Sequence, residues 1–290
     1  MTKILVCGAD GQMGQSFRAV SGNFPAFSFR FASRSDLDIA DRSRVEAFFR
    51  LHAFDFCINC AAYTAVDRAE EDASAAFAIN AEGATHLAEK TAEQGCALIH
   101  FSTDYVFHGG SGVPFREEDR TGPKGVYARS KLAGEKGVLA ANPRTVLIRA
   151  SWIYSEFGHN FVRTMLRLGA ERDRLTVVCD QVGTPTYGPD LAEAVLRIIA
   201  MLESGPTDEA LPYGIYHYSN EGVASWYDFA RAIFEMAELP CSVLPIPTRD
   251  YPTPAERPPY SLLDKSKIKA TFNLDIPYWR DSLKVCLTNI

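Results

Sequence analysis

A strand, a glycine-rich turn and a helix follow one another at the start of the chain, and this order constrains the fold most. The apolar run "KILVCGA" leads into "GADGQMG", which spaces Gly8, Gly11 and Gly14 as G-x-x-G-x-x-G. Glycines at such a turn let the backbone bend sharply and approach a pyrophosphate, whose charge then lies at the helix N-terminus. This placement predicts a dinucleotide-binding turn, whereas a glycine triad without such flanks is a weak signal.

The first half of the chain alternates short apolar runs with helical patterns. Apolar strands separated by helices are typical of a parallel sheet that is covered on both faces. We therefore expect an α/β fold, a doubly wound parallel sheet of the Rossmann type. The expected strands are residues 3–9, 26–33, 54–62, 97–103 and 145–151, and the expected helices are 11–20, 42–52, 73–94 and 129–141.

The composition changes after about Trp152. Prolines gather in "LPCSVLPIPTRDYPTPAERPPY", and the helical patterns at 188–203 and 225–237 are separated by irregular segments. We expect an NAD(P)-binding Rossmann domain at 1–152 and a smaller, mainly substrate-binding domain at 153–290, with some segments returning to the Rossmann sheet.

Charge and hydropathy argue against several classes of protein. The 290 residues carry a net charge of -6, which argues against a general affinity for nucleic acid or anionic membranes. The first apolar run is too short for a secretory signal, and no apolar segment approaches the length of a membrane span. We expect a cytoplasmic protein.

The seven cysteines are scattered, and many lie inside apolar runs, so we expect reduced core thiols. Cys57 and Cys60 form a C-x-x-C in "CINC", but that stretch reads as a buried strand. Residues three apart on a strand point to opposite faces, which disfavours a redox or zinc site. We expect no metal.

Arg34 stands in "ASRSD", at the expected end of the second strand. Dehydrogenases of classical spacing have an acid near this place, which binds the ribose 2′-hydroxyl. A guanidinium suits a 2′-phosphate instead, so the residue favours NADPH over NADH. The alternative is that Arg34 is only solvated.

Tyr127 and Lys131 lie four residues apart in "YARSK" and share one face of a helix that follows the fourth strand. The fourth strand continues into "FSTDYVF", which brings Thr103 towards the crevice where doubly wound sheets bind ligands. Each residue alone suits a structural role, as a half-buried tyrosine, a surface lysine or a strand-end threonine. Their combination with the glycine turn favours catalysis.

Reduction of a carbonyl needs a hydride on carbon and a proton on oxygen. The phenol of Tyr127 could supply the proton if a nearby ammonium and a cationic nicotinamide lowered its pKa from about 10. We expect Lys131 to lower that pKa and to anchor the ribose, and Thr103 to donate a hydrogen bond to the same oxygen.

Further motifs follow in one order along nearly the whole chain: "GADGQMG", "LDIAD", "NCAAYTAVDRAE", "FSTDYVFHG", "PFREED", "YARSKLAGE", "RASWIYSEFGHNF", "DQVGTPT" and "ERPPYSLLDKSKI". With them the chain resembles the extended short-chain dehydrogenase/reductases, and within these the dTDP-4-dehydrorhamnose reductase subfamily. The resemblance implies an NADPH-preferring reductase, with NADH as the alternative. Its partner would be a dTDP-sugar, dTDP-4-dehydro-L-rhamnose, whose 4-keto group is reduced to give dTDP-L-rhamnose.

The resemblance also assigns roles to individual residues. The implied cofactor contacts are Gly11, Gln12 and Met13 along the pyrophosphate, Asp38 and Ile39 near the adenine, and Ala61, Ala62 and Tyr63 after the third strand, beside the catalytic pair Tyr127 and Lys131. The implied substrate contacts are Thr103, Asp104, Trp152 and Arg257, the last of these towards the substrate phosphates.

The sequence departs from the subfamily at two places. Ala128 stands where many relatives have glycine, which is harmless on a helix. Some relatives bind Mg²⁺ at a dimer contact through an acid after the glycine loop, where this chain has Gln15 and Ser16. The metal is therefore not expected, and a homodimer is left open.

Three alternatives share the same scaffold. One is a cofactor-binding regulatory subunit of the S-adenosylmethionine synthetase type, and the presence of Thr103 and Trp152 argues against it. The second is an epimerase or dehydratase; a dehydratase would want an acid pair after the strand-end threonine, where only Asp104 stands. The third is a reductase of another keto-sugar nucleotide.

Overall fold

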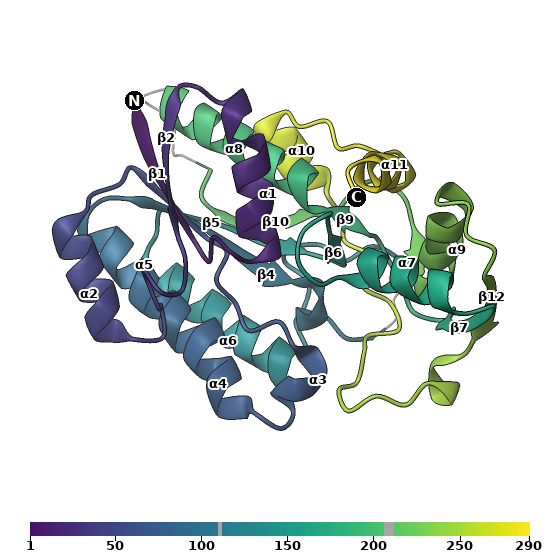
Figure 1. Cartoon of the computed structure of the whole chain (residues 1–290). Helices are drawn as coiled ribbons and strands as arrows, with labels where there is room; N and C mark the ends of the chain where they lie inside the picture. Colours follow the sequence, from purple (N-terminus) through teal and green to yellow (C-terminus); the bar gives the residue numbers. More distant parts are fainter. Residues whose placement is uncertain (110–111, 206–211) are drawn as a thin grey trace.

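Six parallel strands form the central sheet of the computed structural model, which describes residues 1–109, 112–205 and 212–290 (Figure 1). Their order across the sheet is β2-β1-β3-β4-β5-β10, so the winding reverses between β1 and β3. The predicted doubly wound α/β fold is confirmed. The strands are β1 (Thr2–Cys7), β2 (Phe27–Ala32), β3 (Phe56–Asn59), β4 (Ala97–Thr103), β5 (Thr145–Ala150) and β10 (Gly214–Tyr218).

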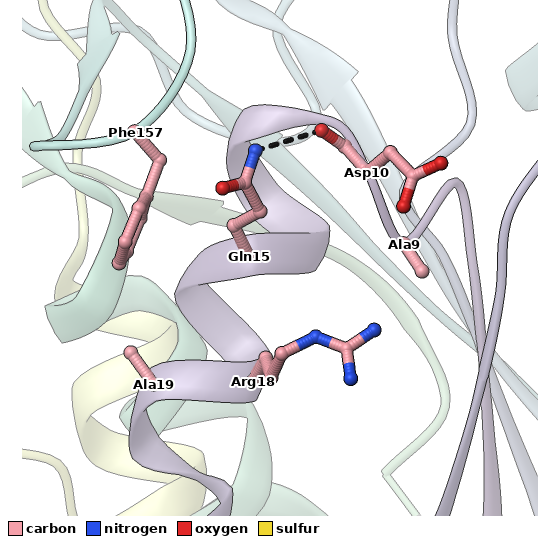
Figure 2. Close-up of a pocket in the computed structure, with 6 residues that line it drawn as sticks. All are labelled: Ala9, Asp10, Gln15, Arg18, Ala19 and Phe157. Atoms are coloured by element: carbon pink, nitrogen blue, oxygen red, sulfur yellow. Dashed lines mark hydrogen bonds between the residues drawn. The ribbon is translucent and has the colours of Figure 1, made fainter.

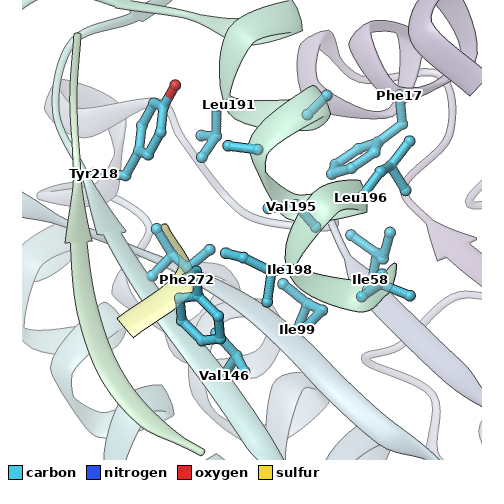
Figure 3. Packing of buried hydrophobic residues seen from close by; sticks show 14 of the residues in the cluster. Phe17, Ile58, Ile99, Val146, Leu191, Val195, Leu196, Ile198, Tyr218 and Phe272 are labelled. Carbon is cyan, nitrogen blue, oxygen red and sulfur yellow. The ribbon is translucent and has the colours of Figure 1, made fainter. Parts of the chain in front are cut away.

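Helices cover both faces of this sheet because successive residues of each strand point to opposite sides. Ile4 and Val6 of β1 pack with α1, α8 and α10, whereas Leu5 and Cys7 pack with α2, α5 and α6. Figure 3 shows the first of these layers, where residues of α1 and α8 meet those of the strands. The covering helices are α1 (Gln12–Val20), α8 (Gly188–Ser204) and α10 (Ser266–Phe272) on one face, and α2 (Arg42–Leu51), α5 (Ala84–Glu93) and α6 (Gly125–Ala141) on the other.

A second, smaller core lies beside the sheet, at the right of Figure 1. It packs Tyr154 and Phe229 against Trp279, and a capping box between Ser225 and Asp228 begins its helix α9. Its elements are β6 (Ile153–Tyr154), α7 (Phe161–Glu171), β7 (Arg174–Val178), β8 (Val182–Gly183), β9 (Thr186–Tyr187), β11 (Ala224–Ser225), α9 (Trp226–Met236), β12 (Ser242–Ile246) and α11 (Trp279–Thr288). The domain boundary near residue 152 stays a prediction; α8, β10 and α10 come after it in sequence and pack on the sheet.

The helix expected over 73–94 is interrupted by a π-helical turn, Ala78–Gly83, between α4 (Ala73–Phe77) and α5. Asn80 in this turn receives the backbone N–H of Tyr63 at 2.8 Å and donates to the Tyr63 carbonyl and to Ser130. A Cβ at Gly134 would lie 2.0 Å from the Asn80 carbonyl oxygen, so α6 contacts this turn through its backbone. Such turns often occur at functional sites.

Short elements connect these layers. Helix α3 (Val66–Ala69) follows β3, and α6 begins at Gly125 rather than near residue 129, which puts Tyr127 in its first turn. The 3₁₀ helices are η1 (Ser21–Asn23), η3 (Asp104–Val106) and η4 (Thr248–Asp250).

Candidate active site

Two of the three glycines in the turn after β1 stand where a side chain would collide with the backbone. Gly8 has φ +68°, and a Cβ there would lie 2.6 Å from the backbone N of Ala61. A Cβ at Gly14 would lie 2.5 Å from Ala9 Cα. Gly11 is different, because its Cβ would meet only the Gly8 carbonyl oxygen, at 3.3 Å.

Gly11 is also the N-cap of α1 and supplies no side-chain cap. The first N–H groups of that helix therefore receive no cap from the side chain of their own N-cap residue, and they carry the positive end of the helix dipole. A phosphate fits at such a terminus.

A hollow of about 210 Å³ lies in front of this turn, at the point where the strand order reverses. It brings together seven of the residues predicted to bind the cofactor. They are Gly8, Gly11, Arg34, Asp38, Ile39, Ala61 and Ala62, joined by Asp10, Leu37, Cys60 and Ile79, which sequence reasoning did not assign.

The remaining predicted cofactor residues do not line this hollow, and two of them, Tyr127 and Lys131, lie on α6. Gln12 donates from Nε2 to the Ile153 carbonyl at 3.0 Å, and its buried Oε1 has no hydrogen-bond partner among the described residues. The same holds for the buried hydroxyl of Tyr63. Met13 packs against the core below the sheet, and Gly14 faces Ala9. Two orphan polar atoms beside an uncapped helix terminus fit a polar dinucleotide.

Arg34 extends from the end of β2 over the hollow and keeps 77% of its side chain exposed. Its Nε donates to Asp38 at 3.0 Å. The guanidinium is thus held over the hollow while most of its surface remains open.

Tyr127 is half-buried on α6, and its phenol lies near enough to the Thr103 hydroxyl for Thr103 to lower its pKa. The ring of Tyr105 meets it edge-on, with 6.0 Å between centroids. Burial raises the pKa of Tyr127 to about 12, the Thr103 contact opposes this, and the Asp104 charge adds to it. The lowered pKa expected from the sequence depends on a bound nicotinamide and stays a prediction.

Lys131 lies one turn along α6 and is only 3% exposed. Its Nζ donates to the Phe101 carbonyl of β4 at 2.6 Å. Burial lowers the pKa of this ammonium to about 8, and the Glu135 charge opposes that shift. The predicted surface alternative is wrong, since the lysine is a buried group.

Asp104 follows Thr103 and is buried at the end of β4. It accepts a hydrogen bond from the Thr103 hydroxyl at 3.1 Å. Burial raises the pKa of Asp104 to about 7, against hydrogen bonds from Ser261 and Thr103.

A larger cavity of about 600 Å³ opens between Tyr105 and the smaller core. Arg257 lines it, as predicted for a residue on the substrate side, and Asp67 lies beside it. Sequence reasoning missed most of the other lining residues, although the charged run "ERDR" before an apolar strand was a usable signal. They include Phe161, Arg172, Arg174, Gln181, Trp226 and Tyr251.

Trp152 is placed behind this cavity rather than in its lining. Its ring stacks on Trp226, with 3.7 Å between centroids and 11° between planes, and Trp226 lines the cavity. Trp152 has φ +47°, a left-handed conformation that non-glycine residues adopt rarely. The backbone of Gly183 leaves room for it, because a Cβ there would lie 2.9 Å from the indole.

A third hollow, of about 440 Å³, lies on the outer side of α1 (Figure 2). Gln15 donates from Nε2 to the Asp10 carbonyl at 2.7 Å. Arg18 and Phe157 line the same hollow. Throughout the described ranges, no three His, Cys, Asp or Glu side chains gather closely enough to hold a metal ion.

All seven cysteines are free, as predicted, and five of them are buried. Cys57 lies inside β3, whereas Cys60 lies beyond its end and reaches the cofactor-side hollow. No helix in the described part of the chain is both long and apolar enough to cross a membrane.

The position of the smaller hollow, at the reversal of strand order, places the chain in the class of dinucleotide-binding α/β proteins. The whole chain, residues 1–290, matches the family model described as the RmlD substrate binding domain, and the chain belongs to that family.

The names of similar proteins support this family assignment. The chain is 43% identical over 287 residues to the dTDP-4-dehydrorhamnose reductase of Sinorhizobium fredii (strain NBRC 101917 / NGR234), covering 97% of this chain and 95% of that protein. It superposes on the dTDP-4-dehydrorhamnose reductase of Clostridium acetobutylicum ATCC 824 with a TM-score of 0.93, at 38% identity over 99% of both chains. For the Bacillus anthracis str. Ames enzyme in complex with NADP, the TM-score is 0.92 at 34% identity, over 100% of this chain and 99% of that one. The predicted subfamily resemblance is confirmed, and the chain is an oxidoreductase.

Proposed function

We propose that the protein reduces the 4-keto group of dTDP-4-dehydro-L-rhamnose to give dTDP-L-rhamnose, using NADPH. One observation carries this proposal: the Tyr127 ring meets edge-on the ring of Tyr105, which lines the larger cavity, and the Tyr127 phenol lies near Thr103 at the end of β4. The names of the relatives support the same reaction.

Bound NADPH would supply the hydride. Tyr127 would then donate its proton to the carbonyl oxygen as negative charge develops there. A pKa of about 12 suits this direction, because it keeps the phenol protonated at neutral pH until an alkoxide forms. Thr103 would share a hydrogen bond with the phenol and the developing oxyanion.

Lys131 would remain charged near pH 7 and hold the base of this site through its bond to Phe101. We assign to the glycine turn and to Gln12 and Tyr63 the pyrophosphate and ribose side of the cofactor. Their orphan polar atoms support that assignment.

The sugar nucleotide would occupy the larger cavity. Arg172, Arg174 and Arg257 line it and would attract a diphosphate, while Trp226 offers a flat ring to a base or sugar. Trp152 would act from behind, by fixing the Trp226 ring.

The preference for NADPH rests on Arg34, whose exposed guanidinium lies over the cofactor-side hollow. The Bacillus anthracis relative in complex with NADP supports it. We place the protein in the cytoplasm, consistent with seven free cysteines. Light scattering on the purified chain decides between a monomer and a homodimer.

The deciding experiment follows NADPH oxidation at 340 nm with a panel of keto-sugar nucleotides that vary the nucleotide and the sugar separately. We expect the highest kcat/KM with dTDP-4-dehydro-L-rhamnose. A higher kcat/KM with another sugar nucleotide would identify that compound as the preferred substrate instead. Binding of NADPH without turnover of any member would favour the regulatory-subunit alternative.

A further inference from the structure

A buried ion pair lies directly beneath the catalytic lysine. Glu135 and Arg149 are 2% and 3% exposed, and they meet through two bonds, Nε to Oε1 at 2.9 Å and Nη2 to Oε2 at 2.8 Å. The Ser102 hydroxyl donates to the same carboxylate at 2.5 Å. The proposed reaction so far gives this pair no role.

The pair belongs to a series of contacts between regularly spaced residues of α6 and residues of β4. Tyr127, Lys131 and Glu135 are spaced four residues apart, so they lie along one face of the helix. Two of them are held by neighbouring β4 residues, Lys131 by the Phe101 carbonyl and Glu135 by the Ser102 hydroxyl. Tyr127 lies near Thr103, the next residue of that strand.

Glu135 nonetheless makes no ion pair with Lys131, although side chains at this spacing can reach each other. Its carboxylate is occupied by the fork of Arg149 and by Ser102. Arg149 is itself fixed, since Nη1 donates to the Glu117 carbonyl at 3.2 Å and the guanidinium lies 5.0 Å from the Phe107 ring centroid. The carboxylate is thus near enough to act on the ammonium by its charge, yet is held away from it.

We propose that Glu135 and Arg149 are positioning residues for the proposed reductase reaction: Glu135 keeps Lys131 charged, and Arg149 prevents Glu135 from drawing Lys131 away from Phe101. The inference rests on the proposed function. Substitution of Glu135 and substitution of Arg149 should therefore shift the pKa of Lys131 in opposite directions, which distinguishes the two roles.

The electrostatic surroundings of Lys131 support this. Burial disfavours its charge, and Glu135 is the group that opposes burial. His100 of β4 stays neutral, because burial and the Lys131 charge both lower its pKa. The Asp104 carboxyl and the phenols of Tyr127 and Tyr105 are further titratable groups on the catalytic side.

On the far side, His217 of β10 is neutral as well. Burial and the Arg149 charge lower its pKa to about 3. Glu117, whose pKa is raised by burial, accepts from the His217 backbone at 3.0 Å. Glu135 is therefore the carboxylate that interacts with the ammonium.

The test compares Glu135→Gln, Arg149→Met and the double variant, with Glu193→Gln on α8 as an exposed control. Glutamine keeps the shape of Glu135 and can still bond to Ser102. We expect Glu135→Gln to shift the alkaline limb of kcat to lower pH by about one unit, a loss of roughly fivefold at pH 8, with KM changed less. Arg149→Met should lose about 100-fold in kcat, and adding Glu135→Gln should restore about tenfold of this.

A second readout does not depend on turnover. The titration of Lys131 is followed by NMR in the cofactor-free protein labelled with ¹³Cε-lysine, the resonance being assigned by its absence from Lys131→Met. Its pKa should fall in Glu135→Gln and rise in Arg149→Met. Circular dichroism checks folding of each variant.

An unchanged Lys131 titration in Glu135→Gln, or a double variant no more active than Arg149→Met, overturns the inference. Wild-type protein that fails to reduce any sugar nucleotide overturns the proposed function instead. In that case the NMR titration still decides whether Glu135 sets the charge of Lys131.

Discussion

Asp67 and Arg257, 190 residues apart in sequence, form a two-bond ion pair across the rim of the larger cavity. The bonds measure 2.5 Å and 2.6 Å, and the Asp67 carboxylate also receives the backbone N–H of Ala255. The guanidinium donates in addition to the Ala255 carbonyl, so its plane is fixed. This pair joins α3, on the cofactor side, to the C-terminal segment.

We expect Asp67→Asn to raise KM for the sugar nucleotide about tenfold while changing kcat less than threefold, because Arg257 loses its fixed orientation. Steady-state kinetics measures both. In an Arg257→Met background the same change should have little further effect. Glu71→Gln, one turn along and exposed, is the control. A lower KM in Asp67→Asn would mean that Asp67 competes with the substrate.

Tyr127→Phe tests the proton donor. Loss of the phenol should lower kcat by on the order of 10² to 10⁴-fold, because no other acid contacts the carbonyl oxygen in the proposed arrangement. NADPH binding, measured by fluorescence, should stay within about twofold. Tyr278→Phe, at an exposed ring, serves as the control. Near-normal turnover by Tyr127→Phe would reject the assignment.

Arg34→Ala tests the choice of cofactor. The ratio of kcat/KM for NADPH to that for NADH should fall about tenfold, since a phosphate would lose one charged donor. Arg197→Ala removes a comparable exposed arginine, also paired with an acid four residues away, on α8. The assignment fails if Arg34→Ala leaves the ratio where Arg197→Ala leaves it.

Two glycines of the same turn should respond differently to alanine. Gly14→Ala should destabilise the fold by about 3 kcal/mol, because its methyl group would collide with the Ala9 backbone. Gly11→Ala meets only one backbone atom and should fold normally, yet weaken NADPH binding about tenfold by entering the cradle. Urea unfolding and fluorescence titration separate the effects. Equal stability of the two variants would contradict this account.

His217 should make the protein sensitive to acid. Burial lowers its pKa to about 3, so between that value and its ordinary 6.5 the unfolded chain binds a proton that the native protein does not. Stability therefore falls as pH drops below 6.5, by about 2 kcal/mol at pH 5 from this residue alone. The fall in unfolding free energy between pH 7.5 and 5 should be smaller in His217→Gln than in the wild type. Exposed His159→Gln should leave the fall unchanged.

Local signals explain what the sequence could predict. The bounds of β4 match the expected strand, and those of α8 match the expected helix to one residue, because apolar periodicity alone determines them. The observed start of α6, Gly125, comes before the predicted start at residue 129 for a physical reason. Its N-cap, Lys124, supplies no side-chain bond; the cap is Glu70, which receives the Val126 N–H at 2.7 Å from 56 residues away.

The site was predictable on the cofactor side and much less so on the substrate side. The glycine turn is a continuous motif, whereas Arg174 of β7 and Trp226 of α9 meet only through tertiary packing. Glu135 and Arg149 were also missed. A glutamate in a helical pattern reads as a surface charge until the partner strand is known.

Strand β10 determines where the chain can be truncated without exposing its core. It pairs with β5 at the edge of the sheet. Helix α8 packs on the face of the sheet that includes the side chains of Val146 and Ile148. A polypeptide truncated at residue 152 would leave Val146 and Ile148 open to water and an unpaired edge available for aggregation. Because α8, β10 and α10 come from the second half of the chain and complete the sheet of the first, we expect that neither half folds alone.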